Sequence, residues 1–249
     1  MAAGGAVADA LLAEVVDAHG GLERWRSAST IAARARSGGL LLRTRVPGTK
    51  FAAYDVTVGV GDESAVLDPF PEPGSRGVFD HGAARIERDG EVVAGRRDPR
   101  PEFSGRSGLR RSFRWDALDS VYFAGYAMWN YLNTPYLLTR ADVEVRAGEP
   151  CDRDDERWRR LEVVFPASFD THSREQTFYF DEQGMLRRHD YVADVVGGWA
   201  HGAHHCADHV EAGGLRFPTR RWVRPIGPGN RSLPFPTMVW IELDDIRVT

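Results

Sequence analysis

The chain has 249 residues, of which 42% are apolar, 27% charged and 10% aromatic. This composition is typical of a globular protein and excludes disordered, collagen-like and membrane-spanning classes. The formal net charge of −4 provides no global basic field that would indicate nucleic acid or an anionic membrane surface as a partner. At this length, one large hydrophobic core and two smaller ones are both compatible with the composition.

Residue usage gives a first set of expectations about location. Among 32 basic residues only Lys50 is a lysine, which we interpret as coding bias of a GC-rich source rather than selection for arginine. Cys151 and Cys206 lack the CxxC spacing of zinc ribbons, and two cysteines do not indicate a disulfide scaffold. Asp9 and Glu14 interrupt the first apolar run, which has no basic segment before it and therefore does not resemble a signal peptide. We therefore expect a cytoplasmic protein without a membrane span, either a monomer or a weak homodimer.

Hydrophobic periodicity predicts a helix first and strands after it. Apolar residues between positions 6 and 18 share one helical stripe, and the glycine pair at 20 and 21 ends that helix. Alternating apolar and polar residues from Thr30 predict strands over 30–95, the first of which extends to Thr44. Glycine, proline and Asp-Gly pairs separate the runs, as in hairpins.

A second helix is predicted over 116–132, where Asp116 can cap the N-terminus together with Asp119. Its sequence ALDSVYFAGYAMWNYL is apolar or aromatic on every side, so we expect protein all around it. After Pro135 an antiparallel meander is predicted over 142–248. The elements together predict an α+β fold in one domain, 1–249, with a strongly curved antiparallel sheet, or incomplete β-barrel, around a buried central helix.

The order of elements and the opening sequence AHGGLERW resemble the LolA-like fold of bacterial lipoprotein carriers, an incomplete barrel closed by helices. Two further stretches, YFAGYAMWNYLNTPYLL and RRHDYVADVVGGWAHGAHHCADH, are similar to an uncharacterised bacterial family with that fold. The resemblance implies a half-barrel that holds a lipid or another apolar ligand. It implies no established activity.

Strand alternation predicts which side chains face the barrel interior. If Gly197-Gly198 forms a two-residue turn, the opposed pairs are Tyr191 with His204, His189 with Cys206, and Arg187 with Asp208. The same alternation places four apolar or basic side chains of neighbouring strands on that face, namely Phe178, Phe180, Phe217 and Arg221. On the buried helix, one stripe could face this wall and bind a ligand: Tyr122, Tyr126, Trp129 and Asn130.

Polar side chains in an apolar wall need partners, and two interpretations follow. One is a polar network that only stabilises the barrel. The other, our main functional hypothesis, is a cofactor-independent isomerase, cyclase or dehydratase acting on a polyketide- or terpenoid-like molecule. In it His204 is the general acid or base, Tyr191 donates to an oxyanion, and His189 is the alternate proton carrier. Electrostatic support would come from Arg221 or Arg187, and Asp208 completes the catalytic set as the partner of Arg187.

Two alternatives remain open at this point. The first is a carrier, in which the same cavity holds a hydrophobic small molecule without changing it, lined by Phe178, Phe180, Phe217, Cys206 and the helix stripe. The second is a metalloenzyme centred on His189 and His204, with Asp208 as the third ligand of the set. His201, His205 and His209 share the opposite face, where adjacent Cα positions are about 6.6 Å apart and these histidines are about 13 Å apart, which is too wide for chelation. No GxSxG, Walker or Rossmann sequence is present, and no nucleic-acid partner is expected.

Overall fold

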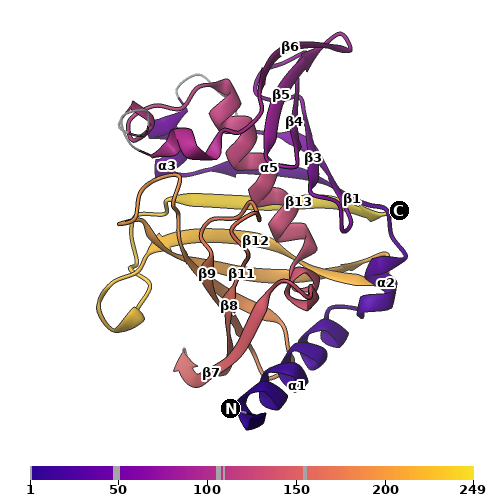
Figure 1. Cartoon of the computed structure of the whole chain (residues 1–249), viewed down its shortest axis with the longest axis vertical. Coiled ribbons are helices and arrows are strands. Elements are labelled where there is room, and N and C mark those ends of the chain that lie inside the picture. Colours follow the sequence, from indigo (N-terminus) through magenta and orange to yellow (C-terminus); the bar gives the residue numbers. More distant parts are fainter. Residues whose placement is uncertain (1, 47–50, 105–107, 109, 154–155) are drawn as a thin grey trace.

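The computed structural model describes residues 2–46, 51–104, 108, 110–153 and 156–249. The described strands form one 13-stranded antiparallel sheet in the order β6-β5-β4-β3-β2-β1-β13-β12-β11-β10-β9-β8-β7. Figure 1 shows this sheet curving around a long helix, α5 (Ala117–Asn133). Because β6 and β7 stand at opposite ends of the order and do not pair with each other, the barrel is open. The predicted fold class is confirmed.

The elements follow one another in three groups. The first comprises α1 (Ala2–Ala18), α2 (Leu22–Arg26), β1 (Thr30–Gly38), α3 (Leu40–Arg45), β2 (Tyr54–Gly59), β3 (Ser64–Asp68), β4 (Arg76–Asp80), β5 (Ala83–Arg88) and β6 (Glu91–Arg96). Between the two sets of strands lie η1 (Arg100–Phe103), α5 and η2 (Tyr136–Thr139). The last comprises β7 (Glu144–Arg153), β8 (Glu156–Val164), β9 (Glu175–Phe180), β10 (Leu186–Val192), β11 (His201–Ala212), β12 (Leu215–Pro225), η3 (Pro228–Asn230) and β13 (Val239–Val248).

The first predicted strand is too long, because it ends at Gly38 rather than Thr44. Gly39 adopts a φ of 118°, and a Cβ at this position would lie 2.4 Å from the carbonyl oxygen of Met238. Only glycine tolerates both conditions, so the chain turns here. The following residues then form α3, which buries Leu41 and Leu42.

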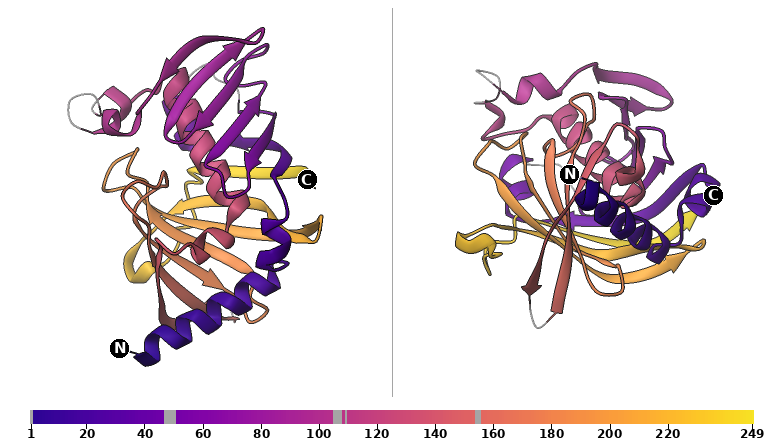
Figure 2. Two further views of the ribbon diagram at one scale, coloured as in Figure 1. Left: turned by 45° about the vertical axis from the view of Figure 1, so that its right-hand side comes forward. Right: turned by 60° about the horizontal axis from the view of Figure 1, so that its bottom comes forward.

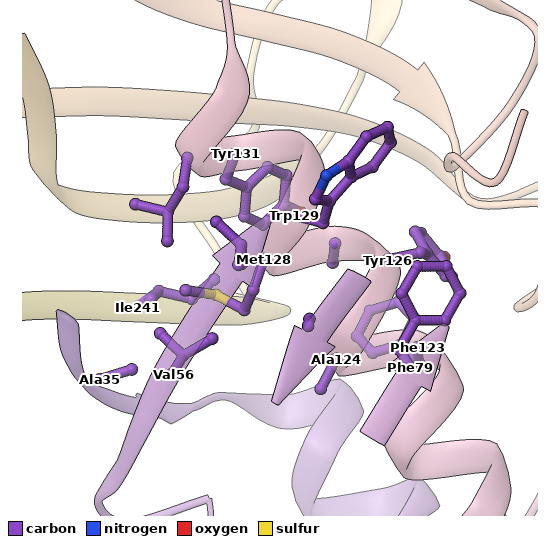
Figure 3. Packing of buried hydrophobic residues seen from close by; sticks show 14 of the residues in the cluster. Ala35, Val56, Phe79, Phe123, Ala124, Tyr126, Met128, Trp129, Tyr131 and Ile241 are labelled. Atoms are coloured by element: carbon purple, nitrogen blue, oxygen red, sulfur yellow. The ribbon is translucent and has the colours of Figure 1, made fainter. Parts of the chain in front are cut away.

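The central helix begins where the capping pattern predicts. The Asp116 side chain accepts a hydrogen bond from the backbone N–H of Asp119, and the Asp119 side chain accepts one from the backbone N–H of Asp116. Every described residue from Asp119 to Asn133 is buried. Figure 3 shows how Phe123, Met128 and Tyr131 of this helix pack toward the sheet. The N-terminal part of α5 lies against β3, β4 and β5, so the helix fills the hollow of the N-terminal strands.

The C-terminal strands form the second half of the curve. Figure 2 shows β7–β12 curling into a half-barrel, with α1 lying across one end. The helix reaches this position by packing Leu11, Val15 and Val16 into the core beside β7 and η2. The N-terminal and C-terminal strands join in the middle of the sheet, where β1 pairs with β13.

Candidate functional site

The half-barrel encloses a cluster of imidazole and phenol rings centred on His172. The Tyr131 hydroxyl lies 2.6 Å from His172 Nε2, and the Tyr126 hydroxyl lies 3.2 Å from His172 Nδ1. The Tyr191 ring stacks on the imidazole with a centroid distance of 4.0 Å. Both ring nitrogens of His172 are therefore occupied by tyrosines. Burial lowers the pKa of His172 to about 3, so the ring is neutral at physiological pH.

His189 and His204 lie on the same face as this cluster, as strand alternation predicts. His189 Nε2 hydrogen-bonds Gln176 Oε1, and the ring stacks on Phe178 at 4.1 Å. His204 Nδ1 lies 3.4 Å from the Tyr191 hydroxyl. Burial, together with nearby cationic and imidazole groups, lowers the pKa of both histidines well below the ordinary value. Both side chains are neutral and enclosed.

The predicted pairing register is wrong by two residues, although the predicted face is right. His189 opposes His204, and Tyr191 opposes Gly202. The reason is the connection after β10, which is longer than the expected two-residue Gly197-Gly198 turn. It begins after Val192, and the backbone N–H groups of Ala193 and Ala200 bond within it. Because the error is an even number, each side chain keeps its face.

Arg187 and Asp208 are corrections, because neither reaches the interior. The β9–β10 register shifts between Leu186 and Arg188, and Arg187, whose side chain is 34% exposed, forms ion pairs with Glu156 and Asp181 instead of Asp208. Asp208 has a φ of 56° and is exposed, with an ion pair to Arg220 at 3.0 Å. The predicted contact between Arg187 and Asp208 does not form. One irregular residue on each strand is enough to break strict alternation.

Arg221 and Cys206 do lie inside. The Arg221 guanidinium donates to Cys206 Sγ at 3.3 Å and to the Tyr131 carbonyl oxygen at 3.0 Å. It also lies over the Tyr131 ring, 5.0 Å from its centroid. Among the described residues no carboxylate forms an ion pair with it. Burial raises the pKa of the Cys206 thiol, which disfavours its thiolate form.

The helix stripe does not meet the histidines of the sheet in the way expected. The Tyr122 hydroxyl donates to Asp170 Oδ1 at 2.5 Å, and the Asn130 amide donates to the Asp170 carbonyl oxygen at 2.8 Å. Trp129 donates to the backbone carbonyl of Gly59. Within the stripe, Tyr126 contacts a histidine, namely His172. The remaining contacts of the stripe hold α5 to its surrounding loops.

Two residues central to the cluster escaped the sequence analysis, His172 and Tyr131. His172 lies between β8 and β9, outside any periodic pattern, in a loop that folds into the barrel. Phe165 and Phe169, four positions apart in that loop, stack on each other at 4.9 Å and are a signal that could have shown its inward packing. Tyr131 lies on the predicted helix but outside the stripe that was expected to face the wall of the barrel.

An apolar cavity of about 160 Å³ opens beside this cluster. Its walls come from α3, α5, the β10–β11 loop, the end of β12 and the start of β13, and include Leu41, Phe123, Val196, Val223, Met238 and Val239. His172, Tyr191 and Arg224 are polar groups of the lining, while Trp199 lines it from the β10–β11 connection and His201 from the start of β11. We call this opening and its surroundings the mouth.

A second space of about 30 Å³ lies deeper, between α5 and strands β1, β2, β12 and β13. It shares four lining residues with the mouth cavity, which are Phe123, Tyr191, Val223 and Val239. The two spaces therefore adjoin along one apolar wall. Phe178, Phe180 and Phe217, which were expected to line a cavity, are fully packed and line neither space.

The described residues contain no group of three or more His, Cys, Asp or Glu side chains placed to hold a metal ion. His189 and His204 face each other, but Asp208 points away, so the ligand set considered from the sequence is not assembled. No helix in the described part of the chain is long and apolar enough to cross a membrane.

Comparison with solved structures gives matches over nearly the whole chain. A LolA superfamily protein from Nitrosomonas europaea is 13% identical with a TM-score of 0.51, covering 92% of this chain and 91% of that one. A DUF1329 family protein from Desulfovibrio piger is 12% identical with a TM-score of 0.52, covering 97% and 92%. Lipoprotein LppX from Mycobacterium tuberculosis is 13% identical with a TM-score of 0.28, covering 96% and 95%. No protein-family model matches the sequence, and no curated protein matches it.

These matches correct two predictions. The acid–base enzyme was our main functional hypothesis. The structural neighbours, which include a LolA superfamily protein, contradict it and favour the carrier alternative. The enclosed, neutral state of His189 and His204 agrees with that correction. The predicted cytoplasmic location is also wrong, because the match to a LolA superfamily protein points away from the cytoplasm. The resemblance noted in the sequence is confirmed: the chain has a LolA-like open half-barrel fold.

Proposed function

We propose that the protein is a non-catalytic carrier that binds a lipid or another apolar ligand at the mouth of the half-barrel. The observation that supports this most directly is the apolar cavity beside α5, which is open to the surface and lined by aliphatic and aromatic side chains. Apolar concave sites with few polar groups are the usual form of small-molecule sites. The LolA-like fold agrees with this function.

The cavity is too small to admit a drug-sized ligand unless its walls move. Its volume of about 160 Å³ is smaller than the roughly 300–1,000 Å³ typical of drug-sized ligands. The adjoining deeper space adds about 30 Å³ along the wall formed by Phe123 and Val223. An alkyl chain therefore starts at the mouth and separates α5 from β12 and β13 as it enters. The walls that move are side chains of Phe123, Met128 and Ile241.

The chemistry of the lining favours an aliphatic or isoprenoid tail. Burying a methylene group contributes about 0.8 kcal/mol, so a few carbons in this cavity give measurable affinity. Two of the polar lining groups, His172 and Tyr191, already have partners within the cluster. We infer that they set the depth to which a tail penetrates.

The test is binding of dansylated undecanoic acid, measured by its fluorescence. We expect saturable binding to the wild-type protein and at least tenfold weaker binding to Val223→Trp, because Val223 lines both spaces and the larger ring fills them. The matched control is Val210→Trp, at an exposed site of the neighbouring strand β11. Equal affinity of the wild type and Val223→Trp would overturn the proposal.

Mass spectrometry of the organic extract from purified protein supplies the ligand class independently. A carrier returns an added ligand chemically unchanged after incubation. A ligand recovered as a new compound would contradict the non-catalytic part of the proposal.

A further inference from the structure

Large apolar side chains are exposed around the mouth. Phe235 is 79% exposed, Trp199 68%, Leu40 42% and Leu233 38%. Exposed apolar residues scattered singly need no explanation, but a group around one opening marks an interaction surface. Trp199 is itself part of the cavity lining, so this group and the cavity share one edge.

Backbone hydrogen bonds bring the other three residues to the same edge. The Leu40 N–H donates to Thr237 at 3.1 Å, two positions from Phe235. The Leu233 N–H donates to the carbonyl oxygen of Pro225 at 2.9 Å, and Pro225 lines the cavity. Figure 1 shows α3 and the loops that follow β10 and β12 on the same side of the molecule. We call segments 40–46, 195–201 and 224–238 the rim.

The rim is basic as well as apolar. Its three segments contain four arginines, Arg43, Arg45, Arg224 and Arg231, and no aspartate or glutamate. None of the four forms an ion pair with a described acidic side chain, whereas Asp194, just outside the rim, is paired with Arg100. Arg43 and Arg231 are exposed. The rim therefore has a local positive charge, although the formal net charge of the chain is −4.

We propose that the rim docks on the surface of an anionic lipid bilayer. Tryptophan and phenylalanine enter the interfacial region of a bilayer, and arginines beside them are attracted to anionic headgroups. A surface that combines both groups, without an acidic residue, complements such a membrane. Docking there places the cavity opening against the acyl chains, so an apolar ligand crosses between bilayer and cavity without exposure to water.

The test is co-sedimentation of the full chain with vesicles. One set is pure phosphatidylcholine, and the other contains one third phosphatidylglycerol. We expect at least fivefold more bound protein on the anionic vesicles, and we expect added salt to reduce the difference because it screens the arginines. Equal binding to both sets, or binding to neither, would overturn the proposal and leave a protein partner for this surface.

Two double variants separate the apolar from the ionic contribution. Leu233→Ser with Phe235→Ser should reduce binding to anionic vesicles at least fivefold, and Arg43→Gln with Arg231→Gln should remove the preference for phosphatidylglycerol. The control, Val92→Ser with Val93→Ser, removes two exposed valines of β6 outside the rim and should bind as the wild type does. If both rim variants bind like the control, the assignment of this surface is wrong.

The inference is distinguishable from the carrier function. Leu233, Phe235, Arg43 and Arg231 do not line the cavity, so both variants should bind dansylated undecanoic acid in solution as the wild type does. That measurement also reports whether each variant is folded. Loss of vesicle binding with intact probe binding supports docking. A wild type that binds vesicles but not the probe removes the carrier proposal alone.

Discussion

Arg221 is a cation enclosed by the half-barrel with neutral groups around it. It is 2% exposed, and its guanidinium contacts a thiol, a carbonyl oxygen and a phenol ring. The positive charge lowers the pKa of neighbouring histidines, although burial is the larger cause for each. The interior therefore keeps its imidazoles neutral, which has consequences for stability below neutral pH.

We expect the free energy of unfolding to fall as the pH falls from about 6.5 toward about 4. Burial holds the pKa of His172 at about 3 and those of His19 and His209 at about 4 in the folded protein. An unfolded histidine titrates near 6.5, so below that pH the unfolded chain binds protons that the folded chain does not. Glu63 opposes this trend, because burial raises its pKa to about 7.

Urea unfolding at a series of pH values measures how the free energy of unfolding depends on pH. A His209→Gln variant should lose part of this pH dependence, because a partly buried imidazole with a lowered pKa is removed. His201→Gln changes an exposed side chain and should leave the pH dependence unaltered. A flat profile between pH 7 and pH 5 in the wild type would contradict the expected proton uptake.

At the residue level, strand alternation identified the interior side chains correctly wherever the strands are regular. His189, Tyr191, His204, Cys206 and Arg221 are all buried, as expected. It failed at Arg187 and Asp208, where a register shift and a positive φ interrupt the alternation. Such irregularities depend on contacts between strands, so a single sequence carries no periodic signal for them.

Among the elements, α5 and β4 approach each other closely at a glycine of the helix, Gly125. A Cβ on Gly125 would lie 2.2 Å from the Cβ of Phe79, so helix and strand approach closely at this point. Alanine normally stabilises a helix by up to about 1 kcal/mol relative to glycine. The steric overlap here exceeds that gain, because relieving it requires α5 to move away from the sheet.

We expect Gly125→Ala to lower the free energy of unfolding by about 1–3 kcal/mol, the usual cost of overpacking a core. Gly5→Ala is the matched control, because Gly5 lies in α1 with no heavy atom within 4 Å of the added Cβ. That variant should be neutral or slightly stabilising. A Gly125→Ala protein as stable as the control would show that the helix and β4 separate at little cost.

The elements themselves were predictable to different degrees. The central helix was located to within one residue at each end, since its capping box and apolar run are both local features. α3 was mistaken for a strand, because LLLRTR is short and its helical form depends on the turn at Gly39 and on the burial of Leu41. A cavity was expected but its position was not predicted, since its walls come from segments far apart in the sequence.

For the whole molecule, the central pairing of β1 with β13 joins the two ends of the chain. Our prediction of one domain has its test in cooperative unfolding. Tryptophans lie in both halves, for example Trp25 and Trp222, while circular dichroism reports the whole sheet. We expect both signals to change at the same urea concentration. Two separated transitions would instead indicate two units that unfold independently.

Because β6 and β7 are not paired with each other, hydrogen bonds between strands do not fix the diameter of the barrel. In a closed barrel the strand number and stagger fix the diameter, so the internal volume cannot grow without breaking hydrogen bonds. A 13-stranded sheet with unjoined ends can uncoil slightly while every strand keeps its neighbours. For the carrier that we propose, ligands of different lengths then share one binding site, and the protein selects them by cross-section at the mouth rather than by length.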